Sequence, residues 1–171
     1  MLTEEEKKFL KKIPYSKKVR IKPFNPKIRK IAEKPIKIIQ KITPELEIKF
    51  MGASALGVAG QGDIDLYILC PSRDFQKYLP VLIDKFGEPK HITKTFIQWS
   101  FTKDAHDVEL YLSDPTPESM RRQLKTFRIL KNSPRLREEY QEIKESFDGK
   151  SYRAYQRKKY EFYNRILAEH N

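Results

Sequence analysis

A glycine-rich connection between two apolar segments constrains the fold of this 171-residue chain more than any other feature. Residues 45–51 and 63–69 both have the length and the apolar character of β-strands, and the connection between them contains four glycines. Because successive side chains of a strand point to opposite faces, Asp63 and Asp65 are expected on one face of the second strand. The sequence therefore predicts two strands joined by a glycine-rich turn, with two neighbouring carboxylates directly after it.

Two carboxylates on one face of a strand are suitable ligands for Mg2+ or Mn2+, because these cations prefer oxygen ligands. Glycine-rich backbone can also approach a triphosphate closely and donate its N–H groups to it. The segment is not a P-loop, since no Gly-Lys-Ser/Thr sequence follows the glycines. A simpler interpretation, a tight turn followed by two solvent-exposed acids, stays open at this point.

A third acid lies on another predicted strand, at residues 107–112. Every second residue of this segment is apolar, which places Glu109 on the opposite, polar face. If this strand lies beside the strand at residues 63–69, Glu109 can join Asp63 and Asp65 in one site.

These motifs, taken in order, resemble the nucleotidyltransferase superfamily typified by DNA polymerase β, which has a small-residue turn, an Asp-x-Asp strand and a later acidic strand. Residues 19–26, with the sequence VRIKPFNP, resemble the opening of the GrpB family within that superfamily. Residues 124–130, 133–144 and 155–162 resemble the basic, acidic and Tyr-x-x-x-Lys helices of the same family. The resemblance extends from about residue 19 to residue 167.

The resemblance implies a Mg2+- or Mn2+-dependent enzyme that transfers a nucleoside monophosphate from a triphosphate, with ATP as the expected donor. In this interpretation Asp63 and Asp65 bind the ions that bridge the phosphates, and Glu109 holds a second ion beside the acceptor. The expected phosphate-binding groups are Gly52, Ser54, Arg128 and Lys159. The acceptor can be a polynucleotide, a protein side chain or a small metabolite.

The chain departs from the family pattern in the turn. Ala53 occupies the place of the usual serine, so that Ser54 comes one position late, and Gly57-Val58 replaces the usual Pro-Gly. All three acids are nevertheless present. Two alternatives to an enzyme therefore stay open: a non-catalytic module that binds nucleotides or nucleic acid on the same fold, and a regulator that acts through protein contacts.

The order of predicted elements indicates an α+β fold: a mixed sheet with helices on one face, followed by a C-terminal helical segment. Pro35 interrupts a helical pattern in residues 26–43, which predicts two short helices or one kinked helix. We expect a capped helix at residues 72–86, further strands near residues 91–93 and at 95–101, and three helices that begin near residues 117, 134 and 151. Residues 1–18 are interpreted as a basic extension with a poorly packed helix at 4–12, and residues 19–171 as a single domain.

Charge is distributed unevenly along the chain. Residues 1–49 contain 15 Lys and Arg against 6 Asp and Glu, residues 50–119 contain 6 against 10, and residues 120–171 contain 14 against 7. Basic flanks around an acidic centre suit a polyanion, so RNA or DNA is a candidate partner. The alternative is that the lysine-rich helices are simply solvated. In the tail, Tyr140, Tyr155 and Phe162 are expected in the core because they recur at helical spacing.

Cellular location is predicted from cysteine usage and hydropathy. The single Cys70 excludes an internal disulfide, and its place at the end of an apolar strand indicates a buried thiol in a reducing cytoplasm. No apolar run approaches the ~20 residues that a membrane-spanning helix needs, and no membrane association is expected.

Overall fold

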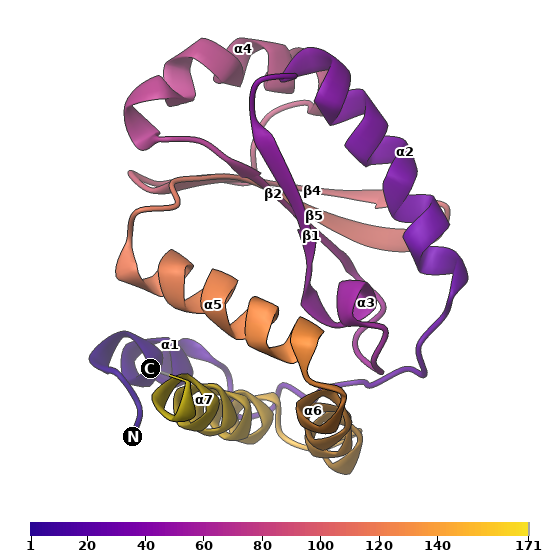
Figure 1. Ribbon diagram of the computed structural model, residues 1–171, viewed down its shortest axis with the longest axis vertical. Helices are drawn as coiled ribbons and strands as arrows, with labels where there is room; N and C mark the ends of the chain where they lie inside the picture. The colour runs from indigo at the N-terminus through magenta and orange to yellow at the C-terminus, as the bar shows by residue number, and fades with distance from the viewer. Residues whose placement is uncertain (171) are drawn as a thin grey trace. The chain divides into compact units, whose positions relative to one another are not determined.

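The structure is a computed structural model that describes residues 1–170 and contains a five-stranded mixed sheet with the order β1-β2-β5-β4-β3 (Figure 1). Strands β2 and β5 are parallel, and the other neighbouring strands are antiparallel. This arrangement confirms the predicted α+β class. The strands are β1 (Glu47–Met51), β2 (Ile64–Leu69), β3 (His91–Ile92), β4 (Phe96–Lys103) and β5 (His106–Ser113).

The chain divides into two compact units. The sheet unit consists of Asn25–Gly57 and Gly62–Arg121, and the helical unit consists of Met1–Phe24, Val58–Gln61 and Arg122–Asn171. The predicted domain boundary after residue 18 remains a prediction.

The sheet unit contains helices α2 (Lys27–Ile42), α3 (Gly52–Leu56) and α4 (Phe75–Phe86). Helices α2 and α4 lie on the same side of the sheet (Figure 1). Alternate side chains of the two central strands, β2 and β5, have no exposed surface and form the core: Ile64, Leu66, Ile68, Val108, Leu110 and Leu112. The predicted alternation of buried and polar residues in both strands is confirmed.

Of the two alternatives predicted around Pro35, a single helix is found, since α2 continues through this buried proline from Lys27 to Ile42. One local prediction is corrected in the sheet unit. The helix predicted to begin at Ser72 begins at Phe75, after a short 3-10 turn, and no side chain caps it. The backbone N–H of Ser72 instead donates to the Asp114 carboxylate at 2.9 Å, so this acid fixes the turn before the helix.

The thiol of Cys70 is free and fully buried, as predicted from its place directly after the second strand. Burial raises the pKa of this thiol to about 11. The side chain therefore stays protonated and unreactive at neutral pH.

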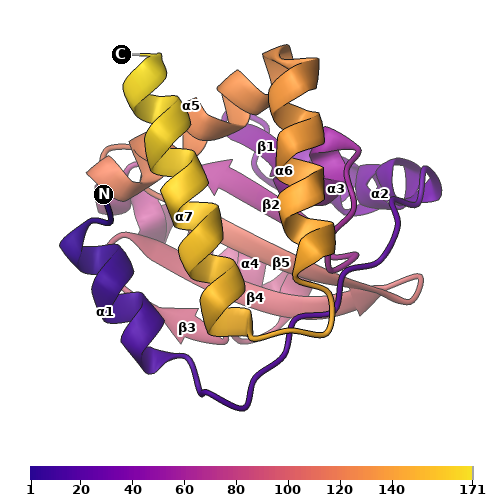
Figure 2. The ribbon, with the colours of Figure 1, turned by 90° about the horizontal axis from the view of Figure 1, so that it is seen from below.

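The helical unit contains α1 (Glu4–Lys12), α6 (Pro134–Ser146), α7 (Tyr152–Glu169) and α5 (Glu118–Asn132) from Arg122 onward. Helix α7 lies between α1 and α6 (Figure 2). The predicted starts of α6 and α7 are confirmed, and the hydroxyls of Ser133 and Ser151 cap them.

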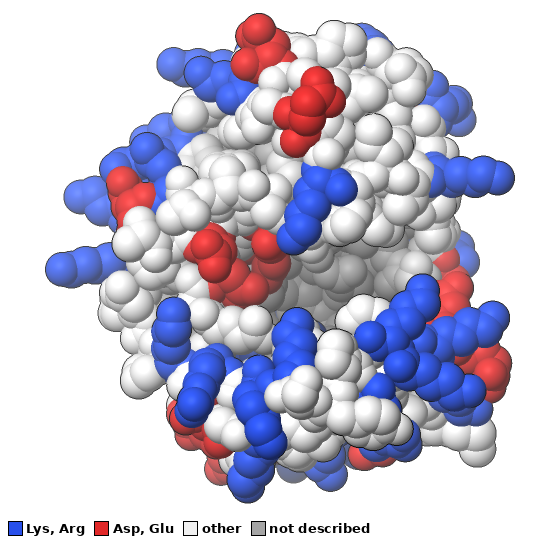
Figure 3. Space-filling model, turned by 180° about the vertical axis from the view of Figure 1, so that it is seen from behind, with Lys and Arg blue, Asp and Glu red and all other residues white. Residues whose placement is uncertain are grey.

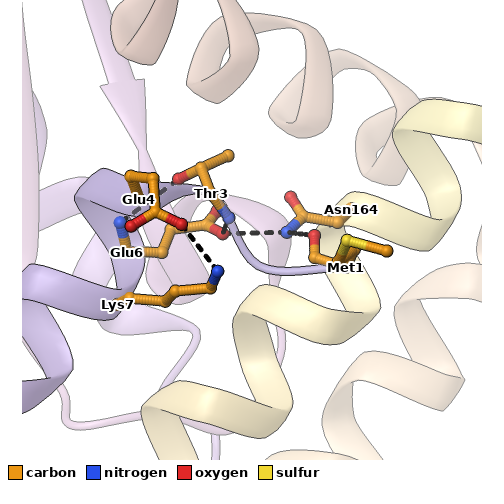
Figure 4. A network of polar contacts seen from close by, with 6 residues as sticks. All are labelled: Met1, Thr3, Glu4, Glu6, Lys7 and Asn164. Atoms are coloured by element: carbon orange, nitrogen blue, oxygen red, sulfur yellow. Dashed lines mark hydrogen bonds and ion pairs between the residues drawn. The ribbon is translucent and has the colours of Figure 1, made fainter.

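Helix α1 is packed in the helical unit, contrary to the expectation of a poorly packed extension. Its Leu10 is only 3% exposed, and Ile13 directly after it is 5% exposed. Figure 4 shows how the first turn is held: Thr3 and Glu6 form a capping box, and Asn164 of α7 donates to the Glu6 carboxylate at 2.9 Å. Two buried apolar residues and one bridging carboxylate therefore help to attach a helix that is otherwise polar.

Candidate functional site

The acids on the two central strands lie side by side. Asp65 of β2 and Glu109 of β5 are direct partners in the parallel register. Partners in a parallel ladder point to the same face, so both carboxylates project from the face opposite the apolar core. Asp63 precedes β2 by one residue and belongs to the same face by alternation. Two strands thus bring together on one face acids that are more than forty residues apart in sequence.

Gly52 is fitted closely to Asp65. This glycine has a positive φ of 78°, and a Cβ atom built on it would lie 2.3 Å from Oδ2 of Asp65. Only a residue without a side chain can occupy this place without displacing the carboxylate. The predicted glycine-rich turn begins with the short helix α3, which starts at Gly52 and ends at Gly57 in the left-handed region. The backbone at Gly52 therefore sets the position of Asp65.

Glu109 is hydrogen-bonded to side chains of the neighbouring strand β4. Its Oε2 accepts hydrogen bonds from Nε2 of Gln98 at 2.7 Å and from the hydroxyl of Ser100 at 2.5 Å. Both donors belong to β4, so Glu109 inclines toward β4 while Asp65 inclines toward Gly52 at the end of β1. Among residues 1–170, no three His, Cys, Asp or Glu side chains form a group able to hold a metal ion.

Ser54 has a structural partner. The residue is 5% exposed, and its hydroxyl donates to the carbonyl oxygen of Asp63 at 2.5 Å. The hydroxyl proton, which a phosphate would need, is used to tie α3 to the start of the acidic strand. At the same edge, Nδ1 of His106 lies 3.1 Å from the carbonyl of Gly62. These contacts fix the backbone directly before Asp65.

Arg128 and Lys159, the predicted phosphate-binding cations, belong to the helical unit. Arg128 is exposed on α5, and Nζ of Lys159 lies 5.6 Å from the ring centre of Tyr163 on α7. Burial lowers the pKa of Lys159, but the neighbouring tyrosines, Tyr163 first, outweigh burial and hold this pKa above its usual value. Lys159 is therefore cationic at neutral pH.

Sequence analysis did not identify the groups that hold Glu109. Gln98 also donates to the hydroxyl of Tyr111 at 3.1 Å, and Tyr111 stacks on Tyr67 with ring centres 4.7 Å apart. A signal was present, because Gln98 and Ser100 alternate with apolar residues in a predicted strand. Their contact with Glu109 depends on the antiparallel register of β4 and β5, which the sequence does not reveal.

Comparisons with known proteins identify a family and a fold. The family model described as GrpB protein matches residues 18–169. The structure is similar to the conserved protein GrpB from Enterococcus faecalis, with a TM-score of 0.58, 16% identity, and coverage of 74% of this chain and 81% of that one. No match was found among curated protein sequences.

A second similar structure is the Cid1 poly(U) polymerase, with a TM-score of 0.51 and 17% identity. The match covers 84% of this chain and 44% of the polymerase, so this chain corresponds to less than half of that protein. At this identity the similarity establishes the nucleotidyltransferase fold alone.

Within the described residues, no helix is long and apolar enough to cross a bilayer.

Proposed function

Because the chain belongs to the GrpB family and has the fold of nucleotidyltransferases, we propose that it transfers a nucleoside monophosphate from a nucleoside triphosphate to an acceptor. ATP is the proposed donor, and Mg2+ or Mn2+ the proposed cofactor. The observation that carries the proposal is the pairing of Asp65 with Glu109, together with the close fit of Gly52 against Asp65.

The donor set fits a hard divalent cation, since it consists of carboxylate oxygens on a half-exposed sheet face. Asp63, Asp65 and Glu109 would hold the ions, which supply charge stabilisation for an in-line displacement at phosphorus. In the reaction, the acceptor oxygen forms a bond to the α-phosphorus, the bond to pyrophosphate breaks, and the acceptor loses its proton to solvent. Glu109 would position the acceptor after it turns away from Gln98 and Ser100.

Backbone N–H groups near Gly52 would bind the triphosphate. Arg128 and Lys159, the cations predicted from the sequence, stay candidate phosphate-binding groups of the helical unit. A guanidinium or ammonium group neutralises charge on phosphate oxygens and on the leaving pyrophosphate. Since the Ser54 hydroxyl donates to Asp63, we propose that this residue supports the turn and reaches phosphate only as a secondary contact.

A non-catalytic nucleotide- or nucleic-acid-binding module is the second candidate. The observation in its favour is that Glu109 is already hydrogen-bonded to two side chains of β4. In such a module the acids would serve to arrange the sheet face, and triphosphate or nucleic acid would bind without turnover.

Thermal unfolding with each common nucleoside triphosphate, in Mg2+ and in Mn2+, tests the proposal. A ligand at a hundredfold excess over its Kd should stabilise the protein by about 2.7 kcal/mol. Asp65→Asn should remove the metal-dependent part of this shift, and Arg128→Ala should weaken binding without removing metal dependence. Asp84→Asn, which changes an exposed acid on α4, is the matched control and should bind as the wild type does.

Turnover separates the two candidates. Labelled nucleotide should be incorporated into an acceptor in the presence of Mg2+, and incorporation should fail for Asp65→Asn and Glu109→Gln. Binding with no incorporation into RNA, DNA or protein would favour the non-catalytic module. The absence of any shift with all triphosphates would refute the nucleotide site itself.

A further inference from the structure

A segment of the helical unit, residues 13–24, is here named the basic strap. It begins with a turn, in which the N–H of Lys17 donates to the carbonyl of Pro14 at 3.2 Å, and is extended from Lys18 onward. Its backbone is fixed at several points to the turn between α6 and α7: the N–H of Val19 donates to Lys150 at 3.0 Å, and the N–H of Gly149 donates to Val19 at 2.9 Å. Further along, Lys22 and Gly60 exchange two backbone hydrogen bonds, of 2.7 and 3.0 Å. The strap is therefore a rigid, extended element, although it is not part of the sheet.

Alternation along the strap separates apolar from basic side chains. Val19 is 1% exposed and faces inward, whereas Lys18, Arg20 and Lys22 are exposed. Residues two apart in an extended chain lie about 6.5 Å apart, a spacing comparable to that of successive phosphates in an extended nucleic-acid strand. The strap contains four Lys and Arg and no Asp or Glu. Within residues 1–170, Lys18, Arg20 and Lys22 form no ion pair.

Tyr15 provides an aromatic surface at the start of the strap. The residue is 82% exposed, and the guanidinium of Arg153 lies over one face of its ring, 3.7 Å from the centre. Arg153 is itself held in place, since its Nε donates to the carbonyl of Ile13 at 3.0 Å. Because one face is covered while most of the residue is exposed, the other face of the ring is open to a stacking partner.

We propose that the basic strap binds single-stranded nucleic acid, with a base stacked on Tyr15 and phosphates on Lys18, Arg20 and Lys22. Exposed aromatics beside a line of cations are the arrangement that binds single strands without sequence preference. A duplex keeps its bases stacked internally and cannot use Tyr15. A membrane surface requires an apolar face to insert, and the inward-facing Val19 is not available for this.

The surroundings of the strap support a polyanion. Figure 3 shows Lys and Arg side chains gathered on the helical unit, in the lower part of the picture. Lys17 adds a cation that lies 4.2 Å from the ring centre of Tyr152, and Lys150 is exposed on the turn beneath the strap. The inference rests on the proposed function only in one respect: a strand bound here would be the acceptor.

Fluorescence anisotropy with a labelled single-stranded oligonucleotide of about 15 nucleotides tests the inference, without triphosphate or metal. The triple variant Lys18→Gln, Arg20→Gln, Lys22→Gln should lose at least about tenfold in affinity, and the salt slope should decrease by about 2 because three phosphate contacts are lost. Tyr15→Ala should lose about tenfold in affinity with an unchanged salt slope, since stacking involves no counterion release.

A matched control carries the same charge change on the sheet unit: Lys30→Gln, Lys41→Gln and Lys85→Gln, all at exposed positions. This control should retain nearly all of its affinity. An equal loss in the control would show that net charge alone binds the strand, and would refute the proposal that the strap is the binding site. Failure to bind the oligonucleotide at low salt, or tighter binding to anionic vesicles or to duplex, would overturn it as well.

The inference and the proposed function can each be refuted without refuting the other. Asp65→Asn should leave oligonucleotide binding unchanged, because the strap contains no part of the metal site. If the strap fails while triphosphate still stabilises the protein in a metal-dependent way, the enzyme stands and its acceptor is not a polynucleotide bound here.

Discussion

In the sheet unit the side chains with no exposed surface on β2 and β5 are all apolar, whereas the helical unit buries an ammonium group among phenol rings. Lys144 of α6 is 4% exposed, and its Nζ donates to the hydroxyl of Tyr155 at 2.8 Å. Beside them, the hydroxyl of Tyr163 donates to that of Tyr140 at 2.7 Å. On β2 and β5 the acids Asp65 and Glu109 thus lie on the face apart from the apolar core, while the helical unit has polar groups within its core.

This difference has consequences for what can be altered. A polar group on a sheet face can change its protonation or partner at little cost in stability, because water replaces the lost contact. A buried hydrogen-bonded group cannot do so, since its partner is left without water. The sheet unit is therefore suited to chemistry, and the helical unit to holding a fixed surface.

The largest expected effect is in the helical core. Lys144→Ala removes a buried ammonium and leaves the Tyr155 hydroxyl without this donor, so we expect a loss of about 3 kcal/mol in the free energy of unfolding. Urea unfolding measures it. Lys158→Ala, at an exposed position of α7, should cost less than about 0.5 kcal/mol. Equal effects in the two variants would mean that the buried lysine contributes nothing special to this core.

The second-largest expected effect is a loss of stability of the helical unit at alkaline pH. Burial raises the pKa of Tyr155 from 10.0 to about 12. A raised pKa contributes stability that is fully present below pH 10 and is lost as the pH rises through 12. The expected loss is roughly 2–3 kcal/mol over this window. Unfolding measured between pH 9 and pH 12 should be steeper for the wild type than for Tyr155→Phe, and identical slopes would contradict the assignment.

In the sheet unit, stability should be lost as the pH falls. Burial raises the pKa of Asp114, but hydrogen bonds from Thr116 and Ser72 outweigh it and lower this pKa from 3.8 to about 2. The stability that it contributes is present above pH 3.8 and is lost as the pH falls through 2. We expect Asp114→Asn to cost about 2 kcal/mol at neutral pH and almost nothing near pH 2. A constant difference between the two proteins across this range would refute the role of the charge.

Much of the sheet unit could be predicted from the sequence because its patterns are local. Alternation within residues 63–69 and 107–112 was sufficient to place Asp65 and Glu109 on the polar side of their strands, and the order of elements was sufficient for the fold class. What the sequence could not supply was strand register and side-chain direction. The partners of Glu109 on β4 follow from an antiparallel pairing, and no local pattern encodes which residues face each other.

The helical tail was less accessible to prediction. The core positions of Tyr140, Tyr155 and Phe162 are confirmed, because helical spacing of aromatics is a strong signal. Lys144 is one of the 14 Lys and Arg of residues 120–171, and no local pattern marks it as buried. Its burial depends on the approach of α7 to α6, which is a tertiary contact. The packing of α1 was underestimated for the same reason, since its partners are on α7, more than a hundred residues later.

The smallest expected effect on stability, and the most informative for the proposed site, comes from two glycines. Gly52 and Gly87 both have positive φ angles, 78° and 80°, so alanine at either position carries backbone strain, about 1–3 kcal/mol. At Gly87 nothing lies within 4 Å of the added Cβ, whereas at Gly52 the Cβ meets the carboxylate of Asp65. The difference in unfolding free energy between the variants should be below about 1 kcal/mol, because a flexible side chain can move aside.

Their metal dependence should differ far more. Gly52→Ala displaces Asp65 and should remove the stabilisation that Mg2+ and triphosphate provide, while Gly87→Ala should retain it. Thermal unfolding with and without the ligands, on both variants, gives the comparison, and backbone strain cancels because each shift is a difference within one variant. If the two variants keep equal metal-dependent shifts, the close fit of Gly52 to Asp65 serves folding alone, and the carboxylate that the turn positions is not a ligand.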